Sequence, residues 1–246
     1  MDNTKQRIAI VTGASRGIGA AAVRRLAADG FAVAINHASS VREANSLADE
    51  ITAAGGKAIA VKADVSDSVA VSGLFDAVRS AFGGVDVLVN NAGIMKLAPI
   101  AKSDDALFDS QISVNLKGTF NTLREAARTL RDGGRIINLS ASMVGLYQPD
   151  YGVYAATKSG VEAMTHILSK ELRGRSITVN AIAPGPTATA LFLDGKPKEV
   201  IDSFAKLAPL ERLGTPEDIA EAVAFLAGPN GAWINGQVLR ANGGTI

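Results

Sequence analysis

Short apolar runs alternate with longer segments of helical spacing along the whole chain. The short runs are rich in Val, Ile and Ala, and several are apolar almost throughout, which is typical of parallel strands that are covered on both faces. Seven strands are predicted, at residues 7–12, 32–36, 57–62, 85–90, 135–139, 177–183 and 237–241.

The longer segments predict six helices, at residues 18–28, 40–54, 68–82, 106–130, 153–173 and 216–226. The last of these follows Thr215 and opens with Pro216, Glu217 and Asp218, which is a strong helix-start pattern. Strands that alternate with helices predict the α/β class, with a doubly wound parallel sheet and helices on both faces. No linker or repeat divides the chain, so we predict a single domain over residues 1–246.

The stretch from 187 to 208 interrupts this rhythm with a weaker pattern and several Gly and Pro positions. It follows the sixth strand, at the sheet edge where an open α/β fold binds its ligand. Long excursions of this kind are often functional, so residues 187–208 are predicted to form a substrate lid.

Composition narrows the possible functions. The 246 residues include no Cys and only two His, His37 and His166, which argues against disulfides, thiolate zinc sites, iron–sulfur clusters and any metal site. The net charge is +1 without blocks of like charge, so neither nucleic acid nor a membrane is expected as a partner. Without a run of 18 apolar residues or a signal-peptide core, we predict a soluble, cytoplasmic protein.

A glycine-rich turn follows the first predicted strand, where residues 12–19 read TGASRGIG. Glycines at this place let the backbone approach a pyrophosphate, whose charge the following helix N-terminus stabilises. The spacing is G-x-x-x-G-x-G, and taken alone it could equally mark a tight turn.

Further motifs follow the later strands in a fixed order. They are Asn90-Asn91-Ala92-Gly93, Asn115, Ser140-Ala141-Ser142, Tyr154 with Lys158, Pro184-Gly185, and Asn242-Gly243-Gly244. Together with the glycine turn they resemble the short-chain dehydrogenase/reductase family, in particular its 3-oxoacyl reductases, over essentially the whole chain. The resemblance implies a Rossmann fold and hydride transfer between a nicotinamide cofactor and a carbonyl or alcohol carbon.

Tyr154 and Lys158 lie one helical turn apart on one face of their predicted helix. By resemblance, Tyr154 exchanges the proton of the substrate oxygen, and Lys158 lowers the pKa of Tyr154 and holds the nicotinamide ribose. Asn115 would hold a water that connects Lys158 to solvent; alternatively, Asn115 only bonds nearby backbone.

The catalytic serine is ambiguous by one position. The family places it thirteen residues before the tyrosine, which is Ala141 here. Ser142 lies twelve residues before Tyr154, and the run Ser142-Met143-Val144-Gly145 resembles the family's serine segment. We therefore assign the role to Ser142, with Ser140 as the alternative.

The residue after the second strand indicates which cofactor is used. NAD-dependent members of the family usually carry Asp where this chain has His37, and no acid follows before Glu43. Arg16, with Ser39 and Ser40 nearby, would suit a 2′-phosphate, so NADP(H) is favoured over NAD(H). The resemblance extends the predicted cofactor contacts to Gly13, Ser15, Arg16, Gly17, Ile18, Gly19, His37, Ser39, Asp64, Val65, Asn91, Ala92, Gly93, Tyr154, Lys158, Pro184, Gly185, Thr187 and Thr189.

The substrate is predicted to be a small carbonyl or alcohol compound, such as a ketone, an aldehyde or a 3-oxoacyl group. Its pocket is expected to be largely apolar, with walls from Met95, Leu97, Val144, Leu146, Tyr147, Tyr151 and residues 191–193. The competing interpretations are a non-catalytic dinucleotide-binding subunit, an NAD-dependent alcohol dehydrogenase and another chemistry on a similar fold.

The two longest predicted helices, residues 106–130 and 153–173, carry more apolar surface than one sheet face needs to cover. In the family these helices pair across a two-fold axis, and the last helix and strand form a second such contact. Two axes close into a homotetramer, which we therefore predict.

Overall fold

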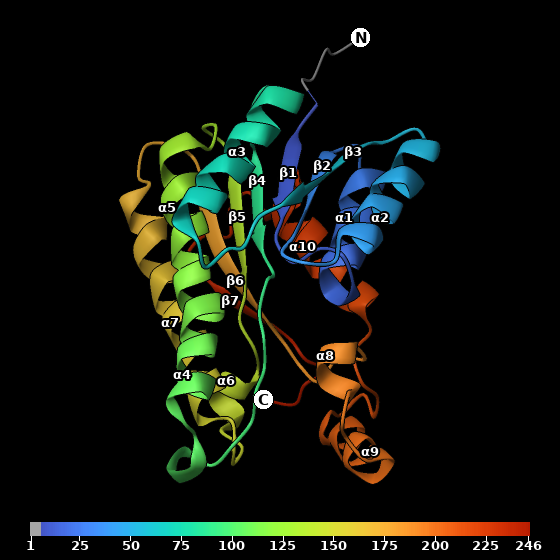
Figure 1. The fold of residues 1–246 in the computed structure, drawn as a ribbon, viewed down its shortest axis with the longest axis vertical. Helices are drawn as coiled ribbons and strands as arrows, with labels where there is room; N and C mark the ends of the chain where they lie inside the picture. The colour runs from blue at the N-terminus through green and yellow to red at the C-terminus, as the bar shows by residue number, and fades with distance from the viewer. Residues whose placement is uncertain (1–5) are drawn as a thin grey trace.

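A parallel sheet of seven strands runs through the centre of the computed structural model, which describes residues 6–246 (Figure 1). The strand order is β3-β2-β1-β4-β5-β6-β7. The strands are β1 (Ile8–Val11), β2 (Ala32–His37), β3 (Lys57–Lys62), β4 (Val87–Asn90), β5 (Arg135–Leu139), β6 (Thr178–Pro184) and β7 (Val238–Ala241). The predicted fold class is confirmed, although the first five residues of the predicted domain lie outside the described part.

Helices cover both faces of this sheet (Figure 1). One face carries α1 (Gly17–Ala28), α2 (Val41–Ala53) and α10 (Pro216–Ala227), and the other carries α3 (Ser68–Phe82), α5 (Gly118–Thr129) and α7 (Gly152–Glu171). Strand β1 shows why both faces must be covered: Ala9 and Val11 pack into one core, and Ile8 and Ile10 into the other.

The helix predicted over residues 106–130 is wrong as one continuous element. The chain forms α4 (Asp105–Gln111), then a π-helical turn (Ile112–Lys117), and then α5. Two buried amides explain the break: Gln111 pairs with both backbone groups of Lys96, and Asn115 pairs with both backbone groups of Ile94. The wider turn turns both amides towards the segment after β4, and such turns frequently mark functional sites.

The segment predicted as a lid contains two short helices that the sequence pattern did not indicate, α8 (Ala190–Leu193) and α9 (Lys198–Leu207). None of the residues of α9 is buried, and the helix lies at the lower end of the molecule, beside the carboxyl ends of the strands (Figure 1). On the other side of this end lie α4 and the short α6 (Met143–Leu146). The lid role itself stays a prediction.

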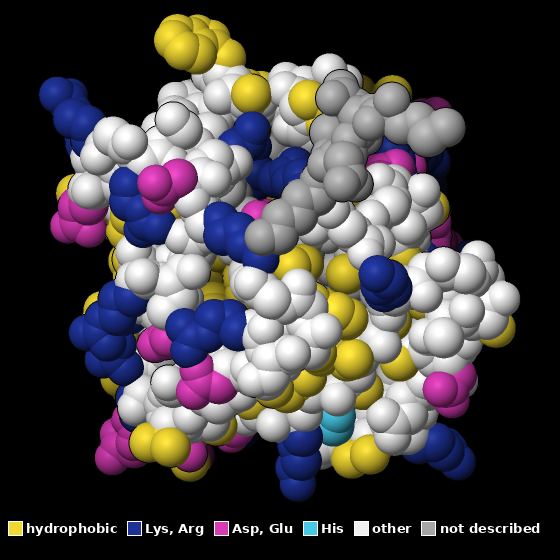
Figure 2. All heavy atoms as spheres, turned by 90° about the horizontal axis from the view of Figure 1, so that it is seen from above, with side chains coloured by type: hydrophobic (Ala, Val, Ile, Leu, Met, Phe, Trp, Pro, Cys, Tyr) yellow, Lys and Arg dark blue, Asp and Glu magenta, His cyan; other side chains and the backbone are white. Residues whose placement is uncertain are grey.

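The opposite end of the molecule, where the strands begin, carries many basic side chains (Figure 2). Three arginines there donate to carbonyls at helix C-termini: Arg7 to Ala227 of α10, Arg131 to Gly83 after α3, and Arg175 to Ala127 of α5. Cations at these positions stabilise the helix ends. These charges are therefore structural. Among residues 6–246, no helix is both long and apolar enough to cross a membrane.

Candidate functional site

The predicted glycine turn lies between β1 and α1 and packs tightly against the end of β4. A side chain on Gly13 would place its Cβ 2.8 Å from Ala92 Cα, and one on Gly19 would approach Asn91 Nδ2 within 2.5 Å. Only glycine therefore fits at both positions. Arg16 provides no side-chain cap to α1, and the first turn of α1 carries no acidic residue. The backbone N–H groups of that first turn are therefore free to bind an anion.

The end of β4 is tied to this turn by a compact set of hydrogen bonds. Thr12 Oγ1 accepts from the backbone N–H groups of Asn91 and Ala92, both at 3.0 Å. Asn91 Nδ2 donates back to the carbonyls of Thr12 and Gly13, both at 2.9 Å. The glycine turn and the β4 end are thus held together as one wall of a groove.

That groove contains most of the predicted cofactor residues. It is lined by Gly13, Ser15, Arg16, Gly17, Ile18, His37, Ser39, Asp64, Val65, Asn91, Ala92, Gly93 and Thr189. Gly19 is absent from the lining; it packs instead against the Asn91 side chain and the backbone of Gly13 and Ala14. Ser40, which was expected beside Ser39, also lines the groove, as does Leu191, which was expected only in the substrate pocket. Val114 lines the groove as well and was not predicted, because no sequence signal marks it.

His37 ends β2 and is only 4% exposed. Burial, together with the neighbouring Lys62, lowers the pKa of its imidazole. Its Nδ1 is buried and has no hydrogen-bond partner among residues 6–246. Asp64 accepts from Ser66 and does not cap α3, whose N-cap is Asp67. The groove beside His37 thus offers Arg16 and two serine hydroxyls to a phosphate, and its one acid, Asp64, lies beyond β3.

A second cavity adjoins the groove and contains the predicted catalytic pair. Tyr154 and Lys158 both lie on α7 and face the end of β5. Lys158 Nζ donates to Leu139 O at 2.7 Å and lies 5.8 Å from the Tyr154 ring centroid. Burial lowers the pKa of Lys158 to about 8, and burial, with Tyr151 nearby, raises the pKa of the Tyr154 phenol. At neutral pH the chain alone therefore holds a protonated phenol beside a largely protonated amine.

Asn115 lies close to this pair, and Gly93 is next to both Asn115 and Lys158. A Cβ on Gly93 would lie 3.3 Å from Asn115 Oδ1 and 3.7 Å from Lys158 Nζ. The Asn115 amide is fully buried, and besides its two bonds to Ile94 it donates to Thr157 Oγ1 at 3.3 Å. Asn115 thus fixes the backbone beside Lys158. The alternative, in which the Asn115 side chain only bonds nearby backbone, agrees with its two hydrogen bonds to Ile94.

Both candidate serines line the cavity, but their hydroxyls have different partners. Ser140 Oγ donates to Glu162 Oε1 at 2.6 Å. Ser142 Oγ donates to Ala183 O at 3.0 Å and accepts from Asn242 Nδ2 at 3.0 Å. Asn242 lies one hundred residues further along the chain, and the sequence did not indicate this contact.

The predicted apolar walls are confirmed in part. Met95, Leu146, Tyr151, Leu191 and Phe192 line the cavity. Leu97, Val144, Tyr147 and Leu193 do not, and Tyr147 is 71% exposed. Val144 and Tyr147 lie outside the cavity because of the backbone after Ser142. There, α6 is interrupted by non-helical angles at Val144 and Gly145, and Tyr147 adopts a left-handed conformation that turns it outward. The remaining predicted residues, Pro184, Gly185 and Thr187, line the cavity.

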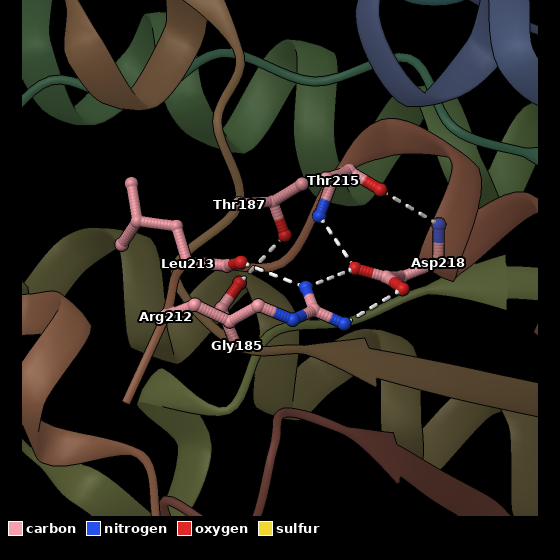
Figure 3. Close-up of polar contacts among 6 residues, drawn as sticks. All are labelled: Gly185, Thr187, Arg212, Leu213, Thr215 and Asp218. Atoms are coloured by element: carbon pink, nitrogen blue, oxygen red, sulfur yellow. Dashed lines mark hydrogen bonds and ion pairs between the residues drawn. The ribbon is translucent and has the colours of Figure 1, made fainter. Parts of the chain in front are cut away.

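The loop after β6 is fixed at its base by a pairing of Thr187 with Gly214, so that the start of the lid segment lies beside the chain that follows it. Figure 3 shows Thr187 with the adjoining start of α10, where Arg212 and Thr215 both donate to Asp218. Asp218 accepts from Thr215 N at 2.7 Å, its own N–H donates to Thr215 Oγ1 at 3.2 Å, and Arg212 binds its carboxylate with two nitrogens. This capping box confirms the helix start predicted from Thr215 and Pro216.

We expect Asp218→Ala to lower the free energy of unfolding by about 0.5–2 kcal/mol, because it removes the capping box and the Arg212 pair together. Urea unfolding at neutral pH measures the loss. Arg212→Met is the matched control: it removes only a half-exposed ion pair, which usually contributes little to stability. A loss from Arg212→Met as large as that from Asp218→Ala would contradict the capping role.

The same contact gives a pH dependence. The Arg212 hydrogen bond, followed by the Thr215 N–H, lowers the pKa of Asp218 to about 2. A carboxyl with a lowered pKa stabilises the fold above its ordinary pKa near 4, and this contribution is lost as the pH falls towards 2. The stability difference between the protein and its Asp218→Ala variant should therefore shrink below about pH 4. A difference at about pH 2.5 as large as that at neutral pH would contradict this.

Comparison with known proteins agrees with this geometry. A family model described as enoyl-(acyl carrier protein) reductase matches residues 13–245. A short-chain type dehydrogenase/reductase from Picea abies is 46% identical over 250 residues, covering 98% of this chain and 92% of the relative. An NADPH-dependent aldehyde reductase-like protein, chloroplastic, from Arabidopsis thaliana is 44% identical, covering 98% and 94%.

Among solved structures, a short-chain dehydrogenase from Burkholderia cenocepacia in complex with NADP superposes with a TM-score of 0.93 at 38% identity, covering 99% of each chain. Because one relative is described as chloroplastic, the cytoplasmic location stays a prediction. Identity of this level over nearly the whole length, on the same fold, places the chain in the short-chain dehydrogenase/reductase family.

Proposed function

We propose that this protein is an NADPH-dependent reductase of neutral, largely apolar aldehydes and ketones, reversible as an alcohol dehydrogenase. The observation that carries the proposal is the position of Tyr154 and Lys158 in an apolar cavity that opens beside the glycine groove. Lys158 is the only charged side chain that lines the cavity among the described residues. Such a cavity suits a substrate without a carboxylate or phosphate of its own. Larger 3-oxoacyl groups remain within this class.

NADP(H) fits the groove for two reasons. Glycines 13 and 17 have positive φ angles and leave the pyrophosphate side open, next to the free N–H groups of α1. The adenosine end has Arg16 from the glycine turn. It also has Ser39 and Ser40 just after β2, where an NAD enzyme would carry an acid. The Arabidopsis relative described as NADPH-dependent and the Burkholderia complex with NADP support the same choice.

The nicotinamide, when bound, supplies or accepts the hydride. The chain's own task is to move one proton and to hold the reacting oxygen. Tyr154 donates its phenolic proton to that oxygen during reduction, since burial keeps the phenol protonated at neutral pH. The Lys158 ammonium, fixed by Leu139 O, stabilises the phenolate that Tyr154 becomes.

Ser142 is the better candidate to hydrogen-bond the substrate oxygen. The Ser140 proton is given to a carboxylate at 2.6 Å, a charge-assisted bond that is costly to break. The Ser142 proton is given to a neutral carbonyl at 3.0 Å, and Asn242 donates to the same oxygen, which polarises its O–H group. Ser142 can therefore redirect its proton to a substrate at lower cost.

The two serines can be separated by a pair of variants. We expect Ser142→Ala to lower kcat by about a hundredfold to a thousandfold, the usual range for the loss of one such donor, whereas Ser140→Ala stays within a few-fold of the parent. Steady-state rates with a saturating aldehyde give both values. A loss confined to Ser140→Ala would show that Ser140 is the catalytic serine and that the assignment to Ser142 is wrong.

The function itself is tested by following NADPH and NADH oxidation with a panel of aldehydes, ketones and 3-oxoacyl thioesters. We expect oxidation of NADPH with at least the apolar aldehydes or ketones, and weaker binding of NADH by fluorescence titration. Tight cofactor binding without turnover on any carbonyl would favour the alternative of a non-catalytic dinucleotide-binding subunit. Tighter binding of NADH would contradict the cofactor assignment.

We further propose a homotetramer in the cytoplasm. Large apolar side chains are exposed in two groups that match the two predicted contacts: Phe108, Phe120 and Ile167 on α4, α5 and α7, and Trp233, Phe225 and Leu239 around α10 and β7. Trp233 is 98% exposed in the single chain. Covering such groups is a common reason for association. Light scattering should give four times the 25.3 kDa chain mass, and a single-chain mass would contradict the proposal.

A further inference from the structure

Tyr151 lies three residues before Tyr154 and takes the N-cap position of α7. It is only 6% exposed, and it lines the catalytic cavity together with Tyr154 and Ser142. Its ring meets the Tyr154 ring edge-on, with 6.3 Å between the ring centroids. The sequence predicted Tyr151 only as part of an apolar wall, but a tyrosine also brings a hydrogen-bond donor.

The hydroxyl of Tyr151 has no hydrogen-bond partner among residues 6–246, in contrast to the hydroxyls of Ser140 and Ser142. It is not one of the sealed, unpartnered polar atoms either, so it faces open space. The cavity is the open space that this buried residue lines. Leaving a phenol unpaired in apolar surroundings costs free energy, which a ligand oxygen would recover.

Two further observations support a role for the Tyr151 hydroxyl as a hydrogen-bond donor to the substrate. Burial, and then the nearby Asp150, raise the pKa of Tyr151, so the group keeps its proton through the working pH range. A charge on Tyr151 would also raise the pKa of Tyr154, which means that the two phenol oxygens are within electrostatic reach of each other. Both tyrosines also line the same cavity, so one substrate can reach both hydroxyls.

We propose that Tyr151 determines substrate specificity by donating a hydrogen bond to a second oxygen of the substrate. Because the two rings pack edge-on and both residues line one cavity, a single small substrate can meet both hydroxyls with oxygens on nearby carbons. The preferred substrates are then carbonyl compounds with another carbonyl, hydroxyl or ester oxygen one or two carbons from the reacting carbon. This inference rests on the proposed reductase function and names its substrate class.

A different role would be to stabilise the Tyr154 phenolate by a direct hydrogen bond. That role would serve every substrate equally, and its loss would shift the pH dependence of the rate. Recognition of a second oxygen instead predicts a loss that depends on the substrate, with an unchanged pH profile. The two roles are therefore separable by one variant.

The test is Tyr151→Phe, assayed with NADPH on hexane-2,3-dione, ethyl 3-oxobutanoate and hexan-2-one. We expect kcat/KM to fall about tenfold or more for the two dioxygenated compounds, which is a typical cost of one lost hydrogen bond, and to stay within about twofold for hexan-2-one. Diones are intrinsically more reactive, so only the ratio of variant to parent on each substrate is compared. Tyr147→Phe is the matched control, because Tyr147 is exposed and does not line the cavity.

An equal loss on all three compounds, a shifted pH profile on hexan-2-one, or no loss on any of them would overturn the inference while the reductase function stands. If the unmodified protein oxidises NADPH with none of the three, the inference fails, and the panel of aldehydes, ketones and 3-oxoacyl thioesters decides whether the proposed function fails with it. Cofactor titration of Tyr151→Phe shows that the variant is folded, since its groove is lined by other residues.

Discussion

Tyr154→Phe is expected to lower turnover at least about a hundredfold while the affinity for NADPH stays within a few-fold. The substitution removes one oxygen and leaves the ring, which packs edge-on against Tyr151. The neighbouring Lys158 keeps its bond to Leu139 O. Proton donation is thus lost while the groove is untouched. Steady-state kinetics give the turnover, and a fluorescence titration gives the affinity.

The sign of the pH dependence adds a second check on Tyr154. Burial raises the pKa of its phenol in the chain alone, so reduction, which needs the protonated form, should be fast at neutral pH and slow down at alkaline pH. Oxidation of an alcohol needs the phenolate and should rise with pH. A Tyr154→Phe variant with parental turnover, or reduction that accelerates steadily with alkalinity, would show that another group carries the proton.

The five central strands could be predicted from the sequence because they are buried along nearly their whole length, whereas the edge strands β3 and β7 are partly exposed. β2 and β6, for example, are buried along almost their entire length, and burial of that kind requires the continuous apolar runs that the sequence shows. The break of the helix after Gln111 could not be predicted, because its cause is tertiary. Helical spacing records which positions are apolar, but it does not record that Asn115 bonds the backbone of Ile94, twenty-one residues away.

The site shows the same division between local and tertiary signals. The glycine turn was recognisable because the close approach of Gly13 to Ala92 permits no other residue, so its cause is written in the residue type. The loop after β5 has no hydrophobic periodicity from which its backbone could be predicted. Tyr147 was expected in the pocket wall from its residue type alone, but its left-handed backbone conformation leaves the side chain exposed. Asn242 donates to Ser142 because the C-terminal segment of the chain folds back next to the loop after β5, and the sequence does not show this contact.

Lys158→Met should damage both halves of the site, unlike Tyr154→Phe. The side chain is buried, and its Nζ is the donor to Leu139 O at 2.7 Å. Methionine fills a similar volume but leaves that carbonyl without this donor, removes the ammonium beside Tyr154, and removes the group that we expect to hold the nicotinamide ribose. We expect a rate at least about a hundredfold lower and NADPH affinity about tenfold weaker, the latter equal to roughly 1.4 kcal/mol.

The charge on Lys158 should also set the upper end of the pH range. Because burial lowers its pKa to about 8, the ammonium is present at neutral pH and is lost above that value, so reduction should decline from about pH 8 upward. Lys170→Met makes the same change at an exposed position of the same helix and should preserve both rate and affinity. If Lys158→Met binds NADPH as tightly as the parent, then Lys158 does not hold the cofactor. If the variant also keeps the parental rate, then the ammonium does not assist Tyr154, and the pairing of these two residues as the centre of the reaction is wrong.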